Sequence, residues 1–316
     1  MKILICPLNW GLGHATRCVP LIRKFMNEGH EVVIAVDGFP LELLKQQFPS
    51  FQFIELPSYR VRYSSGKSQI PAMLGNLPFI AFGVYKEHRW LQRLIKTEHF
   101  DQIISDNRFG LWNKNLNSVY ITHQLMIKMP TSLKFLEPIA WYLHRAFILR
   151  YNECWIPDSE GDENLSGDLS HLYPFPPNYR FVGVLSRFQG LENTPPSTDF
   201  DVVAIVSGIE PQRSIFENQI TERFRNSDKN VLILRGKPQQ NTVTEKSGNI
   251  TLVSHLEDKQ LAAILKGTDK IICRSGYSGI MDLKTLNCLH KTEFSPTPGQ
   301  TEQEYLYSIH STGKRN

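Results

Sequence analysis

Short apolar runs alternate with longer amphipathic segments along most of the chain. Runs of about four to eight apolar residues are typical of buried strands, and apolar residues at helical spacing are typical of helices. In the first part of the chain this pattern predicts strands at residues 2–7, 31–37, 51–56, 102–105, 118–122, 153–157 and 180–185, and helices at 15–27 and 41–48. Such alternation predicts an α/β fold with a parallel sheet covered by helices on both faces.

The pattern is interrupted once and then resumes. Residues 186–200 contain Gly190, Pro195 and Pro196 among Ser and Thr residues, a composition typical of a linker. Strands are then predicted at 201–206, 231–235, 250–253, 270–274 and 291–295, with helices at 211–224, 258–266 and 278–286. The sequence therefore predicts two Rossmann-like domains, residues 1–190 and 196–316. Ligands of such folds bind at the carboxyl ends of the strands.

Composition and charge exclude several classes of protein. The 316 residues are 41% hydrophobic and 21% charged, and the net charge of +4 is weaker than a nucleic-acid binder usually carries, so no nucleic-acid partner is expected. No stretch approaches the ~20 uninterrupted apolar residues of a membrane-spanning helix. The five cysteines are widely spaced and form no CxxC pair, which predicts neither a disulfide framework nor a zinc ribbon and favours a reducing cytoplasm.

The segment from Tyr59 to Trp90 fits the alternating pattern poorly. It begins with a polar loop that carries three basic residues and continues into an apolar run broken by Pro71, Gly75 and Pro78. One interpretation is a buried loop and helix that pack on the first sheet. The other is an apolar patch with basic flanks that docks peripherally on an anionic bilayer, such as the inner face of the plasma membrane.

The first predicted strand runs directly into a glycine turn, GLGHATR, from Gly11 through Gly13 to Arg17. A strand, a Gly-x-Gly turn and a helix N-terminus together present free backbone N–H groups and a positive dipole end, which favour an anion such as phosphate. The turn lacks the third glycine of the dinucleotide fingerprint. His14 stands at the mouth of this turn, where an imidazole could act as a general base, although a lone histidine is more often structural.

The second half contains three comparable segments. SGIEPQRSIFE follows one strand and places Ser207 and Gly208 in its turn, and RSGYSGIMDL follows another. In the latter, Asp282 could accept the hydroxyls of a ribose or could simply complement the helix dipole. SPTPGQTEQEYL contains Glu302, a group suited to sugar hydroxyls, although Thr301 and Glu304 of this segment also fit an ordinary capping box.

GLGHATR, RSGYSGIMDL and PTPGQTEQEYL, in this order on two Rossmann-like halves, resemble a GT-B glycosyltransferase of family 28, the group of the peptidoglycan N-acetylglucosaminyltransferase. The resemblance implies two domains that face across a cleft, with the acceptor held by the first and the donor by the second, which is shorter at its end than is usual. It further implies inverting transfer of N-acetylglucosamine or another hexose from a nucleotide sugar, most simply UDP-linked, without a metal or other cofactor. The donor-binding residues expected from the glycine turns and the resemblance are Gly11, Gly13, Ser207, Gly208, Arg213, Arg274, Ser275, Gly276, Ser278, Asp282, Gln300, Glu302 and Gln303.

Inversion requires a base that deprotonates the acceptor hydroxyl. His14 is the first candidate, and Asp106 is the second because it follows a predicted strand. His123 is the third, although a structural role suits it better. Without a metal, helix N-termini and a cation, Arg213 or Arg274, would meet the charge of the leaving diphosphate.

Two other functions remain open at this point. A GT-B sugar-nucleotide epimerase would place carboxylates around the sugar and need no acceptor. A catalytically weak or inactive relative would bind the nucleotide sugar and lose turnover. The resemblance suggests a saccharide or lipid-linked acceptor and a role in cell-envelope or polysaccharide biosynthesis.

Overall fold

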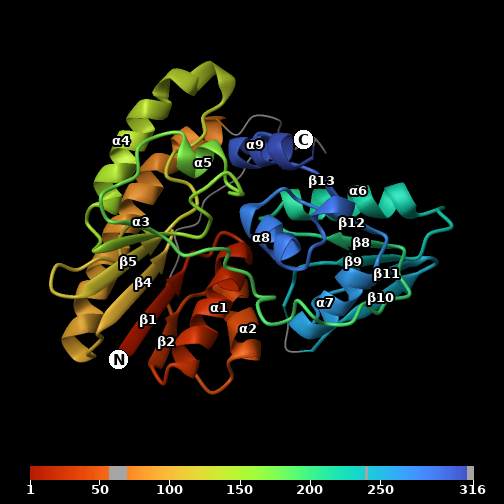
Figure 1. The fold of residues 1–316 in the computed structure, drawn as a ribbon, viewed down its shortest axis with the longest axis horizontal. Coiled ribbons are helices and arrows are strands. Elements are labelled where there is room, and N and C mark those ends of the chain that lie inside the picture. The colour runs from red at the N-terminus through yellow and green to blue at the C-terminus, as the bar shows by residue number, and fades with distance from the viewer. Residues whose placement is uncertain (57–69, 239–240, 312–316) are drawn as a thin grey trace.

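The computed structural model describes residues 1–56, 70–238 and 241–311. Two largely parallel sheets lie side by side with helices on their faces, and each sheet forms the centre of one half of the molecule (Figure 1). The strand order is β3-β2-β1-β4-β5-β6-β7 in the first sheet and β10-β11-β9-β8-β12-β13 in the second. The predicted α/β fold class with two Rossmann-like halves is therefore confirmed.

The first sheet is parallel throughout the described residues. Its strands are β1 (Lys2–Pro7), β2 (Glu31–Ala35), β3 (Gln52–Ile54), β4 (Gln102–Asp106), β5 (Asn117–Ile121), β6 (Glu153–Ile156) and β7 (Tyr179–Phe181). The helices of this half are α1 (Gly13–Asn27), α2 (Gly38–Gln47), α3 (Ile70–Thr97), η1 (Thr131–Leu136), α4 (Glu137–Ile148) and α5 (Asp168–His171). Ile3, Leu4 and Ile5 of the central strand β1 are fully buried, as expected for a strand covered on both faces.

The second sheet begins after the expected linker. Its strands are β8 (Val202–Ile205), β9 (Val231–Leu234), β10 (Thr244–Ser247), β11 (Ile250–Val253), β12 (Lys270–Cys273) and β13 (Thr292–Phe294). Its helices are α6 (Gln212–Phe224), α7 (Asp258–Gly267), α8 (Tyr277–Thr285), η2 (Leu289–Lys291) and α9 (Thr301–His310). The polar β13 lies at the edge of the sheet, where Glu293 pairs with Arg223 and, at 2.6 Å, with Lys270. The exposed β10 pairs antiparallel to β11 at the other edge.

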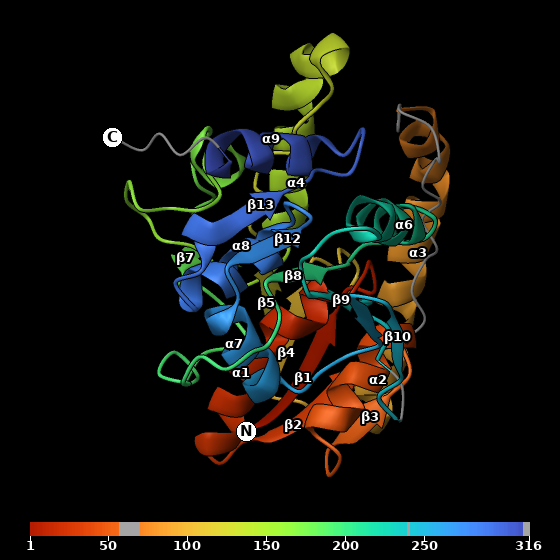
Figure 2. The ribbon, with the colours of Figure 1, turned by 90° about the vertical axis from the view of Figure 1, so that its right-hand side faces the viewer.

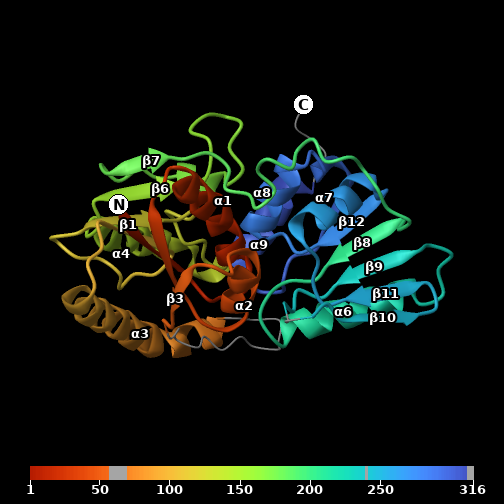
Figure 3. The ribbon, with the colours of Figure 1, turned by 90° about the horizontal axis from the view of Figure 1, so that it is seen from below.

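The last helix, α9, crosses back to the first half of the molecule (Figure 2). Thr301 Oγ1 donates to the carbonyl of Lys128 at 2.7 Å, and Tyr305 Oη accepts from the N–H of Asp168 at 2.7 Å. Helix α8 also contacts helix α1. Figure 3 shows α1, α8 and α9 between the two sheets. The two halves are therefore held together by side-chain contacts as well as by the linker.

The segment from Tyr59 to Trp90 is described only in part, because residues 57–69 lie outside the described residues. The remainder belongs to α3. Leu91 of this helix is buried and packs in one core cluster with Leu4 of β1, whereas Phe79, Phe82 and Tyr85 are exposed. None of the described helices combines the length and the hydrophobicity that a membrane span requires.

Candidate active site

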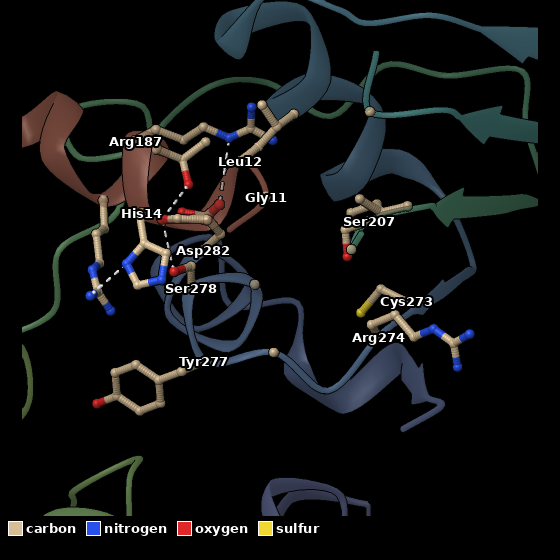
Figure 4. Close-up of a pocket in the computed structure, with 18 of the residues that line it drawn as sticks. Gly11, Leu12, His14, Arg187, Ser207, Cys273, Arg274, Tyr277, Ser278 and Asp282 are labelled. Atoms are coloured by element: carbon tan, nitrogen blue, oxygen red, sulfur yellow. Dashed lines mark hydrogen bonds and ion pairs between the residues drawn. The ribbon is translucent and has the colours of Figure 1, made fainter. Parts of the chain in front are cut away.

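A cavity of about 1060 Å³ lies between the two halves, at the carboxyl ends of both sheets. It is lined from the first half by the turn after β1 and by the residues that follow β4 and β5. From the second half it is lined by the turns after β8 and β12 and by the start of α9 (Figure 4). The lining includes predicted site residues from both halves: Gly11, Gly13, His14, Ser207, Gly208, Arg274, Gly276, Ser278, Asp282, Gln300, Glu302 and Gln303.

His14 lies in the first turn of α1 and is anchored by two buried neighbours. Its Nδ1 lies 3.3 Å from Asp106 Oδ2 and 2.9 Å from Arg17 Nη2. Burial lowers the pKa of His14, the Asp106 carboxylate partly offsets this effect, and the charge of Arg17 adds to the lowering. The imidazole is therefore a neutral base near neutral pH, held at the edge of the cavity.

Asp106 occupies the end of β4, directly beside β1, and is fully buried. Arg17 donates two hydrogen bonds to this carboxylate, from Nε to Oδ2 at 2.8 Å and from Nη2 to Oδ1. Burial alone would raise the pKa of Asp106, but Arg17 and His14 more than offset this and hold the pKa well below its usual range. A buried, ion-paired carboxylate cannot reach an acceptor, so this geometry does not support Asp106 as the base and assigns it to the orientation of His14.

His123 follows β5 and is also buried. Its Nδ1 faces Arg17 Nη1 at 2.9 Å, and its Nε2 faces Glu302 Oε1 at 2.9 Å. Both ring nitrogens are therefore engaged, and His123 has no free lone pair for a substrate proton. The third candidate base is a structural contact between the two halves.

The turn between β12 and α8 presents a helix N-terminus to the cavity. Gly276 is the N-cap of α8, and a Cβ added at this position would meet no atom within 4 Å. The first N–H groups of an α-helix have no partner within the helix, and they carry the positive end of its dipole. This arrangement offers both space and backbone donors for an anion.

Ser278 and Ser275, the serines of this turn, connect neighbouring segments. Ser278 Oγ donates to the carbonyl of Gly13 in the other half at 2.9 Å. Ser275 is fully buried, does not line the cavity, and donates to the carbonyl of Gln303 at 2.7 Å. The geometry therefore favours a structural role for Ser275 over direct contact with a ligand.

Asp282 lines the cavity and is held by the linker. Ser186 Oγ donates to its Oδ1 at 2.6 Å, and Arg187 Nε lies 3.5 Å from its Oδ2. Burial raises the pKa of Asp282 to about 6, against the opposing effect of Arg187. A ribose could reach this carboxylate only beside these existing partners.

The two cations expected near a diphosphate are both engaged elsewhere. Arg213 does not line the cavity, and its guanidinium contacts Glu210 and Glu217 at 2.6 Å each. Arg274 donates to the carbonyl of Pro296 at 2.8 Å and lies over the ring of Phe216. This arrangement does not support Arg213 at the diphosphate, and in Figure 4 Arg274 points away from His14.

The remaining predicted residues line the cavity from the turn after β8 and from the start of α9. Gly208 has a φ of +106°, which glycine adopts readily, and it follows Ser207 after β8. Gln303 Oε1 accepts from the N–H of Thr297 at 2.9 Å, so this side chain supports the loop that precedes α9. Gln300 is the N-cap residue of α9.

Two arginines of the site carry no role in the sequence prediction. Arg17 lies three residues after His14, on the same face of α1, and this spacing could have revealed it. Arg187 lies in the linker, where no pattern distinguishes it, and contacts Asp258 at 3.5 Å as well as Asp282. In the described part of the chain, no group of three or more His, Cys, Asp or Glu side chains could hold a metal ion. Independence from metal stays a prediction.

The chain resembles known proteins in part of its sequence and in its fold. No family model matches the chain. A curated protein of Methanosarcina acetivorans, named an uncharacterized glycosyltransferase, is 33% identical over 115 residues, which cover 35% of this chain and 28% of that protein. The match thus spans little more than a quarter of the relative's length.

Solved structures resemble the chain over nearly its whole length. The spinosyn rhamnosyltransferase SpnG is 13% identical, with a TM-score of 0.59 over 98% of this chain and 84% of that one. A candidate UDP-N-acetylglucosamine 2-epimerase of Listeria monocytogenes is 11% identical, with a TM-score of 0.55 over 99% and 88%. At such identities the likeness concerns the fold, which is the GT-B fold.

Proposed function

Taking the GT-B fold as the premise, we propose that this chain is an inverting glycosyltransferase that moves a hexose from a nucleotide sugar to an acceptor hydroxyl. One observation carries the proposal: a single cavity has the oriented histidine His14 on one side and the helix N-terminus at Gly276 on the other. A base and an anion site that face the same space are what direct displacement of a diphosphate requires. The partial match to a curated glycosyltransferase supports the same activity.

In the proposed reaction, His14 Nε2 accepts the proton of the acceptor hydroxyl as its oxygen attacks the anomeric carbon. This requires the tautomer that carries a proton on Nδ1, which donates to Asp106. Arg17 Nη2 lies 2.9 Å from the same nitrogen, and in this tautomer it cannot donate to His14 and hydrogen-bonds Asp106 instead. With neutral imidazoles, the formal charges of Asp106, Glu302 and Arg17 sum to −1, because this network contains two carboxylates and one guanidinium. Proton uptake by His14 brings this sum to zero, which favours the step.

The leaving nucleoside diphosphate binds, in this proposal, at the N-terminus of α8. The backbone N–H groups beyond Gly276 and the helix dipole meet its negative charge. Arg213 takes no part in this binding, because its guanidinium is already paired with Glu210 and Glu217. Asp282 is assigned to the ribose and Glu302 to the transferred sugar, which are the roles the family resemblance implies. The resemblance to family 28 and the preference for UDP belong to this proposal.

The test is a thermal-shift titration of the protein with UDP, dTDP, GDP, NAD and the glucose, N-acetylglucosamine and rhamnose conjugates of UDP and dTDP. A ligand at 100 times its Kd raises the free energy of unfolding by about 2.7 kcal/mol. We expect a shift with one class of nucleotide sugar and none with NAD. The absence of a shift with every nucleotide would overturn the proposal.

An epimerase is the second candidate, because a candidate epimerase shares the fold. The two activities differ in what they require. An epimerase converts its nucleotide sugar alone, whereas a transferase releases nucleoside diphosphate in proportion to the acceptor supplied. Incubation of the protein with UDP-N-acetylglucosamine alone, followed by chromatography for an isomer, separates them. An isomer would favour the epimerase.

We also propose that the acceptor is presented at a lipid surface. Helices α3 and α4 reach the same end of the molecule (Figure 2). Phe82 on α3 and Tyr142 on α4 are among their exposed apolar side chains. The acidic residues of these two helices, Glu87 and Glu137, are both buried, which leaves basic groups at the surface and complements anionic lipid.

The experiment for this surface is sedimentation with liposomes at low salt. We expect the protein to sediment with anionic vesicles and not with zwitterionic ones, and the paired changes Phe82→Ser and Tyr142→Ser to abolish sedimentation. Equal recovery in the supernatant with both vesicle types would refute membrane contact. A cytoplasmic location and a role in cell-envelope or polysaccharide biosynthesis stay predictions.

A further inference from the structure

An unbroken series of side-chain contacts joins the start of α9 to the base in the other half of the molecule. Glu302 Oε1 lies 2.9 Å from His123 Nε2, and His123 Nδ1 lies 2.9 Å from Arg17 Nη1. Arg17 in turn holds Asp106, which contacts His14. His123 is the link through which the donor half reaches this network.

The partners of His123 fix where its proton lies. A guanidinium can donate hydrogen bonds but has no acceptor, so Nδ1 of His123 must present its lone pair to Arg17. The ring proton is then on Nε2, where it is donated to the Glu302 carboxylate. If the proton moved from Nε2 to Nδ1, His123 would lose its hydrogen bonds to both Arg17 and Glu302.

The ring of His123 is also fixed in place by packing. It stacks on the ring of Tyr277 from α8, with centroids 4.2 Å apart and planes 5° apart. Tyr277 Oη donates to the carbonyl of Pro157 at 2.9 Å, which anchors this second ring in the first half of the molecule. The backbone carbonyl of His123 accepts from Ser170 Oγ at 2.7 Å. His123 therefore cannot follow Glu302 if that residue moves.

We propose that His123 is a positioning residue that sets the orientation of Glu302 and thereby the strength with which the cavity holds the donor sugar. Hydrogen bonding of Oε1 to His123 leaves Oε2 of Glu302 for a sugar hydroxyl in the cavity that Glu302 lines. His123 itself touches neither the sugar nor the acceptor. This inference rests on the proposed function. It predicts that changes at His123 that break its contact with Glu302 weaken binding of the nucleotide sugar and leave binding of the nucleotide alone unchanged.

A matched pair of variants tests it. In His123→Gln the amide oxygen can accept from Arg17 while the longer side chain still donates to Glu302. In His123→Asn the side chain can accept from Arg17 but is too short to reach Glu302. Calorimetric titration with UDP and UDP-N-acetylglucosamine, or with dTDP and dTDP-glucose if those bind instead, gives the affinity that the sugar adds.

We expect His123→Asn to weaken binding of the nucleotide sugar tenfold or more while the nucleotide alone changes less than twofold. His123→Gln should stay within threefold of the wild type for both. His310→Gln is the control for general loosening of α9, because His310 contacts the carbonyl of Leu165 near the other end of that helix, and it should alter neither affinity. In a Glu302→Gln background, His123→Asn should add less than a further twofold, since its effect passes through Glu302.

Equal weakening of nucleotide and nucleotide sugar by His123→Asn, or no weakening of either, would overturn the inference. Fully additive effects of His123→Asn and Glu302→Gln would do the same. If the wild type binds no nucleotide at all, the proposed function fails first, and that result is distinct from a wild type that binds while the variants match it. Thermal unfolding of each variant verifies that it is folded.

Discussion

Two buried arginines, one in each half of the molecule, show how the same strand–turn–helix geometry serves different chemistry. Arg17 follows the turn after β1 and contacts a carboxylate and two imidazoles, whereas Arg274 opens the turn after β12 and donates to backbone carbonyls over the ring of Phe216. Burial disfavours the charged form of both side chains and by itself lowers their pKa values. For Arg17 the nearby Asp106 carboxylate outweighs burial, and the pKa is raised. Among the described residues, Arg274 has no such carboxylate beside it, and burial lowers its pKa to about 10.

The difference separates proton transfer from anion binding. The first turn builds a charged, hydrogen-bonded network around His14, which suits a base. In the second turn, Arg274 hydrogen-bonds backbone carbonyls, and the N-terminus of α8 faces open space at Gly276.

The largest effect is expected from His14→Ala. Loss of the base should lower turnover by about 10²–10⁴-fold, the usual contribution of acid–base catalysis. The fold and the nucleotide site should remain, because His14 lies at the edge of the cavity and not in the core. Steady-state kinetics with saturating donor measures the effect, and unchanged kcat would remove His14 from the mechanism.

Changing each arginine to methionine compares the two networks directly. Arg17→Met leaves Asp106 buried without its partner and should reduce the free energy of unfolding by about 3–5 kcal/mol. Arg274→Met leaves only carbonyls unpaired and should reduce it by about 1–3 kcal/mol, with nucleotide affinity changed less than threefold. Urea denaturation measures both. A larger loss of stability for Arg274→Met would reverse our account of the two turns.

Gly276→Ala sharpens the assignment of the anion site. The added methyl group meets no atom within 4 Å and the backbone φ is −81°, so the free energy of unfolding should change little. The methyl group would occupy the space in front of the α8 N-terminus, and affinity for the nucleoside diphosphate should fall about tenfold, or roughly 1.4 kcal/mol. Retention of full nucleotide affinity would place the diphosphate elsewhere.

The pH dependence separates His14 from Asp282. The lowered pKa of His14 keeps the base unprotonated until the pH falls below its usual value of about 6.5, so kcat should stay level from pH 8 to that point and decline only below it. The pKa of Asp282 is about 6, and its protonation should raise the donor KM below that pH. A decline in kcat that begins above pH 7 would contradict the assignment of His14.

Much of the fold was predictable because buried parallel strands form continuous apolar runs. The central strands β1, β4 and β5 were predicted to within one residue at each end. Strand β10 was not predicted, since TEKS is polar and lies exposed at the sheet edge. Helix α4 was missed for the opposite reason: Ile139 and Tyr142 lie on its exposed face, so apolar residues do not mark only its buried side.

The position of the candidate site was predictable from the sequence, but the contacts between its side chains were not. Strand ends and glycine turns indicated which segments line the cavity. The interpretation of Arg213 as a free cation overlooked Glu210 and Glu217, three residues before it and four after it, and this spacing was visible in the sequence. The contact of His123 with Glu302 joins residues 179 positions apart, and no local pattern can show it.

The central claim is that one cavity places the base on the first turn and the donor anion on the second. Calorimetric titration of a nucleotide sugar into the wild type, His14→Ala and Gly276→Ala tests it most directly. The account predicts that His14→Ala binds within about threefold of the wild type while Gly276→Ala binds about tenfold more weakly. Loss of binding in His14→Ala with full binding in Gly276→Ala would contradict the account.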